Sequence, residues 1–281
     1  MRNYGTWILL AILWLSASPA AFAADPSIVP FSLGTGYRLM YDLEFDQAHQ
    51  VFLSWQQQHP DDPLGPVSDA AGILFAELNR LGVLESQFYA DDKRFDARKK
   101  LTPDSEVRDR FNAALALADT RAHARLAKDP KDRDGLFALT LSSGLKADYA
   151  ALIEKRNLAS LSYTKEASAL AGQLLASHPK CYDAYLATGI GKYIIGSMAA
   201  PVRWFLRVGG FAGDKKAGID ELKLTAEKGD YLAPFARILL AIAYVRDKDR
   251  VHAREILASL QTEFPRNPLF AHEISRLDQG E

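Results

Sequence analysis

Residues 34–63, GTGYRLMYDLEFDQAHQVFLSWQQQHPDDP, and residues 239–268, LLAIAYVRDKDRVHAREILASLQTEFPRNP, share one pattern of small, large and proline residues. A shift of 205 positions pairs the residues of the two stretches. The pairs are Gly36 with Ala241, Leu39 with Tyr244, Ala48 with Ala253, Phe52 with Leu257, and Pro60 with Pro265. Both stretches predict a first helix, a polar turn, and a second helix that runs to the residue before the proline.

The spacing of the small residues has a physical reason. Two antiparallel helices approach closely only where small side chains lie at their crossing, and Gly36 and Ala48 provide them in the first stretch. Large residues three or four positions away then fill the seam. Because proline lacks an N–H and has a fixed φ, Pro60 ends the second helix. One hairpin cannot bury its apolar face alone, so we expect several hairpins to stack.

The pattern resembles the tetratricopeptide repeat (TPR), a helical hairpin of about 34 residues. The residues that match are Leu39, Phe45, Ala48, Phe52 and Pro60 in the first stretch and Tyr244, Ala253, Leu257 and Pro265 in the last. Trp55, Arg250 and Leu260 depart from the family pattern. The resemblance implies an all-α fold over residues 24–281, a right-handed TPR-like α-solenoid of about four to five helical hairpins with an inserted connector helix.

The middle of the chain follows the pattern less regularly. Residues 105–132 predict a second helix that ends at Pro130, with Thr102 as N-cap and Pro103 at the first helical position. Residues 163–189 predict another, which ends before Pro179. The unequal spacing of the prolines indicates extra residues at 82–103 and 202–218.

The first 23 residues have the pattern of a secretory signal peptide. Arg2 precedes an apolar run over residues 7–15, and the small residues Ala21 and Ala23 of Ala21-Phe22-Ala23 suit cleavage before Ala24. A retained membrane anchor is the weaker interpretation, because Pro19 follows this run too early for a spanning helix of about 20 apolar residues. We expect an exported protein, periplasmic or extracellular, with no transmembrane segment in the mature chain.

The charge balance and the single cysteine argue against a nucleic-acid-binding protein and against a disulfide-stabilised one. Without residues 1–23 the chain holds 33 Lys and Arg against 35 Asp and Glu, since Arg2 is the only charged residue removed. This near neutrality argues against a nucleic-acid partner, which favours a strong basic excess. Cys181 is the only cysteine, so no disulfide forms within the chain. Cys181 and His178 resemble half of a metal site, but we expect Cys181 to be a small packed residue.

Residues 202–218, VRWFLRVGGFAGDKKAG, allow three interpretations. They do not fit a phosphate-binding loop, because Asp214 stands where the motif requires lysine. Arg203 and Arg207 lie four positions apart beside apolar residues, as in a short interfacial helix, which predicts peripheral membrane contact through residues 201–211. We favour a connector, with a short helix from Pro201, a break at the glycine pair 209–210, and a next helix capped by Asp214.

Residues 190–245 resemble a further family. The stretch GSMAAPVRWFLRVGGFAGDKKAGIDEL, at 196–222, is similar to a segment of the eukaryotic TPR family associated with the mitochondrial outer membrane and inclusion clearance. In that family a helix–GF-x-GD–helix element joins two repeats. The stretch also resembles exported bacterial repeat proteins. The resemblance supports the connector and implies no activity.

The sequence predicts no enzymatic activity, no cofactor and no metal. None of the six histidines belongs to an H-E-x-x-H motif, and there is no G-x-S-x-G motif. His59 and His178 precede repeat prolines, where a structural role at a helix end is expected. We expect His49 and His252, beside the small crossing residues, to lie on outer helix faces.

The leading functional hypothesis is a non-enzymatic protein- or peptide-binding scaffold in the cell envelope. In such a solenoid the first helices of successive hairpins line the binding surface. The candidate binding residues on those helices are Tyr37, Asn79, Tyr149, Tyr185, Lys192, Tyr193 and Arg237. One alternative is a carrier of a small hydrophobic ligand or lipid in an inner aromatic-lined pocket. A third is an enzyme of an unrecognised type.

Overall fold

Leu43 and Lys248 have the same left-handed backbone conformation, with φ of 62° and 63°. The amides of residues 42–44 bond back to carbonyl groups of the preceding helix, and the amides of residues 247–249 bond to the equivalent carbonyls. Residues 81–83 make the same three bonds, with Gly82 at φ 68°. The sequence repeat is therefore also a repeat of turn geometry.

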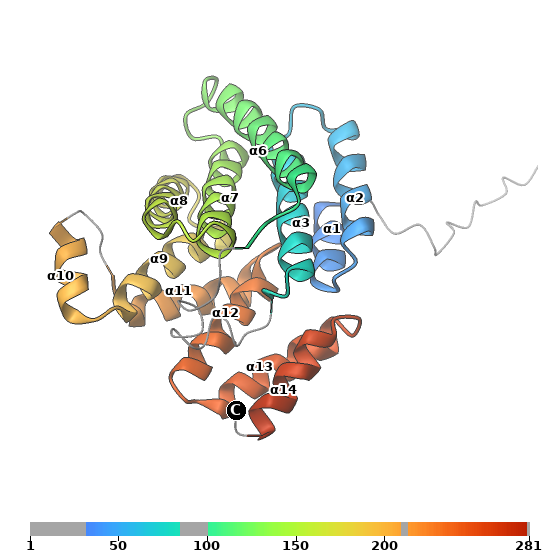
Figure 1. Cartoon of the computed structure of the whole chain (residues 1–281). Coiled ribbons are helices and arrows are strands. Elements are labelled where there is room, and N and C mark those ends of the chain that lie inside the picture. Colours follow the sequence, from blue (N-terminus) through green and yellow to red (C-terminus); the bar gives the residue numbers. More distant parts are fainter. Residues whose placement is uncertain (1–31, 85–100, 209–212, 280–281) are drawn as a thin grey trace, which may run out of the picture. The chain divides into compact units, whose positions relative to one another are not determined.

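The computed structural model describes residues 32–84, 101–208 and 213–279 (Figure 1). All regular secondary structure in these ranges is helical. This confirms the predicted all-α class. The α-helices are α1 (Leu33–Tyr41), α2 (Phe45–Gln58), α3 (Leu64–Arg80), α6 (Ser105–Leu126), α7 (Arg133–Asp148), α8 (Asn157–Ser177), α9 (Tyr185–Ser197), α10 (Ala200–Val208), α11 (Lys215–Lys228), α12 (Ala233–Arg246), α13 (Arg250–Glu263) and α14 (Pro268–Gln279). A π-helical turn, Tyr149–Ile153, extends α7, and a 3₁₀ turn, Tyr182–Ala184, precedes α9.

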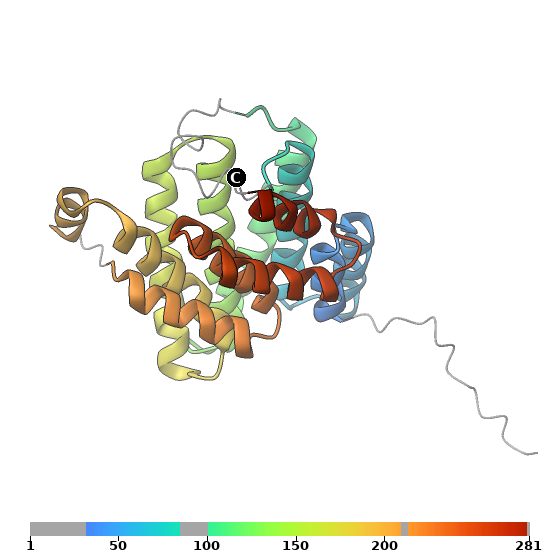
Figure 2. The ribbon, with the colours of Figure 1, turned by 90° about the horizontal axis from the view of Figure 1, so that it is seen from below.

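The helices pack in chain order. The described helices form five successive antiparallel pairs: α1 with α2, α3 with α6, α7 with α8, α9 with α11, and α12 with α13. Each pair also contacts the next, and α14 packs on α13 (Figures 1 and 2). In the sequence, α10 lies between α9 and α11.

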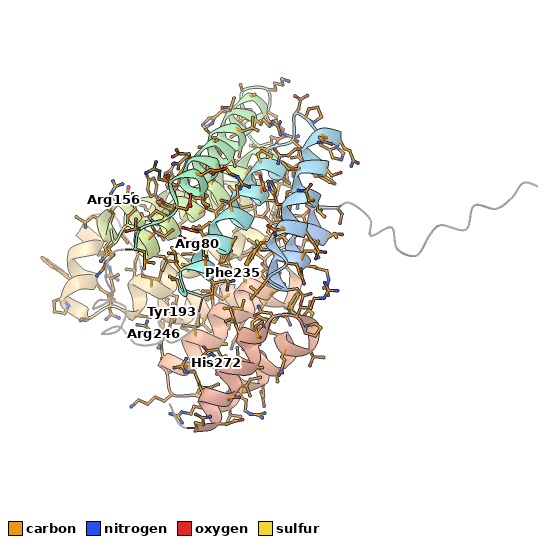
Figure 3. All side chains as sticks on the ribbon, turned by 45° about the vertical axis from the view of Figure 1, so that its right-hand side comes forward. Arg80, Arg156, Tyr193, Phe235, Arg246 and His272 are labelled. Carbon is orange, nitrogen blue, oxygen red and sulfur yellow. The ribbon has the colours of Figure 1, made fainter. Side chains whose placement is uncertain are left out.

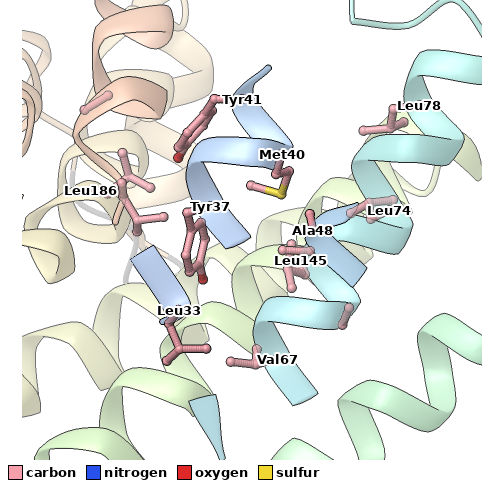
Figure 4. Close-up of a cluster of buried hydrophobic side chains, with 14 of the residues drawn as sticks. Leu33, Tyr37, Met40, Tyr41, Ala48, Val67, Leu74, Leu78, Leu145 and Leu186 are labelled. Atoms are coloured by element: carbon pink, nitrogen blue, oxygen red, sulfur yellow. The ribbon is translucent and has the colours of Figure 1, made fainter. Parts of the chain in front are cut away.

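The small residues of the repeat lie at the helix crossings. Ala48 and Ala253 are fully buried, and Ala241 is 2% exposed. A Cβ atom at Gly36 would lie 2.3 Å from Cε1 of Phe52, so only glycine leaves room for this buried ring. Figure 4 shows Ala48 among the buried side chains of α1 and α3. The small crossing residues therefore act as the spacing predicts.

The first and last hairpins contact each other. The Tyr41 ring lies 5.5 Å from that of Phe264, and Nδ2 of Asn267 donates to the carbonyl of Tyr41 at 2.9 Å. Arg38 forms an ion pair with Glu263 at 3.1 Å. The described residues thus belong to one compact unit in which sequence-distant hairpins meet. In an open solenoid each repeat contacts only its neighbours.

One predicted helix start is wrong. Asp104, not Thr102, is the N-cap of α6, because its carboxylate accepts from the amides of Glu106 and Val107. Pro103 therefore precedes the helix. The predicted signal peptide, most of the extra residues at 82–103 and the glycine pair 209–210 lie outside the described residues.

Helix lengths and compositions allow one limited test for membrane spans. Within the described ranges, only Arg133–Ile153 is long and apolar enough to cross a bilayer. Two thirds of its apolar window, 67%, is buried against the rest of the protein, as in a core helix. The candidate is weak evidence for a span.

Candidate binding surface

Tyr37 lies in the core and does not line an open surface. The residue is 3% exposed, and its hydroxyl accepts a hydrogen bond from Oγ of Ser68 at 3.1 Å. Its ring stacks on that of Tyr231, with the ring centroids 5.1 Å apart. Burial raises the pKa of Tyr37 above its ordinary range. Tyr37 therefore does not face a ligand, and that expectation is wrong. Helical spacing alone does not distinguish a tyrosine in the core from one on the binding surface.

Lys192 and Arg237 join helices through ion pairs. Nζ of Lys192, on α9, lies 2.5 Å from Oε1 of Glu221, on α11. Arg237, on α12, pairs with Glu263 of α13, which also pairs with Arg38 of α1. Nε of Arg237 is buried and has no hydrogen-bond partner among the described residues. Both cations already have carboxylate partners, so a peptide carboxylate would have to displace them.

Tyr149 and Tyr185 stack on neighbouring rings. The Tyr149 ring is 5.2 Å from that of Phe111, and its buried hydroxyl has no hydrogen-bond partner in the part of the chain that the structure describes. The Tyr185 ring is 6.5 Å from that of Tyr182. Both tyrosines are half-buried. Each therefore offers only one edge to a ligand.

Asn79 and Tyr193 are the candidates with most freedom to bind. Asn79 is exposed at the end of α3. Tyr193 is half-buried on α9, and burial raises the pKa of its phenol, although the charges of Arg246 and Lys215 act to lower it. Figure 3 shows Tyr193 beside Arg246. This part of the surface combines an aromatic ring with nearby positive charge.

The seven candidates do not form one site. In the described part of the chain, no side-chain hydrogen bond, ion pair or ring contact joins any two of them. Those on α9 are the largest group on one element, and they adjoin the α9–α11 crossing. The packing of α9 on α11 therefore determines where these candidate side chains lie.

Glycines bring the backbones of α9 and α11 into contact. A Cβ atom at Gly218 would lie 2.6 Å from the amide nitrogen of Tyr193 and 2.7 Å from the carbonyl oxygen of Gly189. At the next turn, Gly196 and Gly213 meet in the same way. The amide of Asp214 donates to the carbonyl of Lys192 at 3.1 Å. The end of α9 and the start of α11 therefore lie next to each other.

α10 lies in the segment of chain that connects the end of α9 to the start of α11. Asp214 caps α11 by accepting from the amide of Ala217 at 3.0 Å, as predicted. α10 begins at Ala200, one residue before the predicted start at Pro201, and the predicted break after it lies outside the described residues. Its described contact with α9 is a hydrogen bond of 3.0 Å from Nη1 of Arg203 to the carbonyl of Gly196. An open hollow of about 460 Å³ separates α10 from the start of α11.

His49 and Asp69 form a pair that the sequence analysis did not anticipate. Nδ1 of His49, on α2, lies 2.5 Å from Oδ1 of Asp69, on α3, and Nε2 lies 3.5 Å from Nη2 of Arg110. Burial raises the pKa of Asp69, while the hydrogen bond and charge of His49 lower it. Asp69 stands within the apolar run of α3, and a buried acid needs a partner, so the sequence does indicate that Asp69 is paired. His49 thus lies against a neighbouring helix rather than on an outer face.

Asp183 is a second polar group that was not anticipated. Its carboxylate is 3% exposed and accepts from the amides of residues 230–232, which lead into α12. Burial raises the pKa of Asp183, although these amide bonds act to lower it. Asp183 therefore fixes the start of α12 from the 3₁₀ turn before α9. The sequence carries no local signal for it, because donor and acceptor lie 47 residues or more apart.

Cys181 is buried, as expected, and burial raises the pKa of its thiol. Among the described residues, no group of three or more His, Cys, Asp or Glu side chains is arranged to hold a metal ion. Comparison with protein-family models and with curated proteins gives no match for this chain.

Proposed function

We propose that this chain is an exported, non-enzymatic binding module that recognises an extended or helical peptide segment of a cell-envelope protein. The proposal includes a right-handed TPR-like arrangement of the hairpins. The observation that carries it is the recurring hairpin turn at Leu43, Gly82 and Lys248, together with buried small residues at the crossings. Stacked hairpins present their first helices side by side, which suits a peptide.

The proposed peptide surface lies on α3, α9 and α12. The first hairpin contributes little, because Tyr37 is buried and α1 is held against the last hairpin. Tyr193 is the central residue of the surface. Ile194, beside it, is 41% exposed, and Arg246 places positive charge nearby, together with Lys215, which forms an ion pair with Asp247. An aromatic anchor with basic neighbours suits a peptide that carries an acidic residue or a carboxyl terminus.

The carrier hypothesis has less support. The inner aromatic side chains contact one another instead of surrounding a space. Tyr37 packs on Phe52 and Tyr231, and Phe75 packs edge-on against Phe235 at 5.5 Å. Native mass spectrometry of the purified protein tests for a retained lipid.

A displayed random-peptide library provides a direct test of peptide binding. The full chain is used for selection, and the affinity of each selected peptide is measured by fluorescence anisotropy. We expect Tyr193→Ala to weaken binding by about tenfold or more, as for the loss of an aromatic anchor. Tyr163→Ala is the matched control, because Tyr163 is a half-buried tyrosine on α8, a second helix.

Two outcomes contradict the proposal. One is a selection that yields no peptide with measurable affinity. The other is a set of peptides that bind wild type and Tyr193→Ala equally while thermal unfolding shows both proteins folded.

A further inference from the structure

α10 differs from the other described helices in its surroundings. It packs broadly against no other described element, and it stands apart from the hairpins in both ribbon views (Figures 1 and 2). Trp204, on this helix, is 70% exposed. Tryptophan is enriched at protein interfaces and at membrane–water boundaries, so its exposure on a helix without broad packing points to a partner or a membrane surface.

The charge around α10 is positive although the whole chain has a formal net charge of −1. α10 carries two arginines and no acidic residue. The hollow beside it is lined by Arg203, Arg207, Lys215 and Lys216, with Asp214 as the single acid in the lining. This surface therefore complements an anionic partner.

The arginines of α10 have no carboxylate partner within the described residues. Arg203 donates only to a backbone carbonyl, and Arg207 makes no hydrogen bond or ion pair with a described residue. Lys215 and Lys216 pair with Asp247 and Asp220, but these are exposed pairs, which contribute little stability. A phosphate group can therefore replace the acids at small cost.

We infer that α10 and the start of α11 dock on the surface of a membrane that contains anionic phospholipid. Arg203 and Arg207 contact the lipid phosphates, with Lys215 and Lys216 beside them. Trp204 enters the interface, where the amphipathic indole ring is favoured. With only two helical turns the contact is weak and reversible, and it depends on charge. This inference does not rest on the proposed peptide binding, although Lys215 lies beside both surfaces.

Vesicle flotation of the full chain tests the inference. We expect binding to phosphatidylcholine vesicles that contain phosphatidylglycerol, little binding to pure phosphatidylcholine, and loss of binding at high salt. Arg203→Glu/Arg207→Glu should weaken binding by at least about tenfold. The matched control is Lys128→Glu/Lys223→Glu, which changes the same charge at two exposed lysines, one just after α6 and one on α11. Residues 1–23 are common to all these proteins, so any contribution from them cancels.

Tryptophan fluorescence reports whether α10 itself enters the interface. A blue shift on adding anionic vesicles should disappear in Trp204→Phe and persist in Trp55→Phe, because Trp55 is held by Asp62 at 2.7 Å. Equal binding to neutral vesicles would overturn the inference, as would unchanged binding of the double arginine variant. Binding of glycerol phosphate without binding to vesicles would also overturn it, since the site would then serve a free ligand.

Discussion

Asp148 has the environment of an acid that resists ionisation. It is half-buried at the end of α7, and its side chain does not cap the π-helical turn that follows. Burial raises the pKa of Asp148 to about 7. A raised pKa means that the folded protein binds a proton that the unfolded chain has released, so stability falls as pH rises from about 4 to about 7.

Asp148→Asn should remove this part of the pH dependence. We expect the variant to match wild type near pH 4 and to exceed it by about 1–3 kcal/mol at pH 8, where the ionised carboxylate opposes folding. Urea unfolding at both pH values measures the difference. Asp109→Asn is the control, because the Asp109 side chain is exposed and forms an ion pair with its neighbour Arg108. An equal free energy of unfolding for Asp148→Asn and wild type at pH 8 would contradict this account.

At the scale of the element, the α9–α11 crossing depends on glycine. Gly218→Ala places a methyl group against the backbone of α9, which cannot rotate away as a side chain can. We expect a loss of about 2–4 kcal/mol in the free energy of unfolding. Gly172→Ala is the matched control, since Gly172 is inside α8 and a Cβ atom added there would have no neighbouring atom within 4 Å.

The control should be more stable than wild type by up to about 1 kcal/mol, because alanine is the better helix former. Urea unfolding of the two variants therefore gives changes of opposite sign. If Gly218→Ala is as stable as wild type, the two backbones do not touch in solution.

The elements differ in how far their structure can be predicted from sequence. The first and last hairpins, the α10 connector and the Asp214 cap follow from short-range patterns of small, apolar and capping residues. Asp183 and the His49–Asp69 pair do not, because their partners are distant in the chain. The burial of Tyr37 was missed for the same reason, since Tyr231 and Ser68 cover it from other hairpins.

At the scale of the whole molecule, we expect the contact between the first and last hairpins to couple their unfolding. Asn267 is 6% exposed and makes two bonds: Nδ2 donates to the carbonyl of Tyr41, and Oδ1 accepts from the amide of Leu269 at 3.0 Å. The first bond joins the hairpins, and the second is local to α14. Asn267→Asp keeps the local acceptor and removes the donor to Tyr41.

Hydrogen exchange followed by mass spectrometry distinguishes a closed array of hairpins from an open one. In an open array a change at α14 reaches only α13 and then fades along the chain. Here we expect Asn267→Asp to lower stability by about 1–3 kcal/mol and to speed exchange in α1 as well as in α14. Asp249→Ala removes the cap of α13, which bonds the amide of His252, and should leave α1 unchanged. If Asn267→Asp speeds exchange in α14 alone, the hairpins at the two ends unfold independently, and the contact between them does not stabilise the fold.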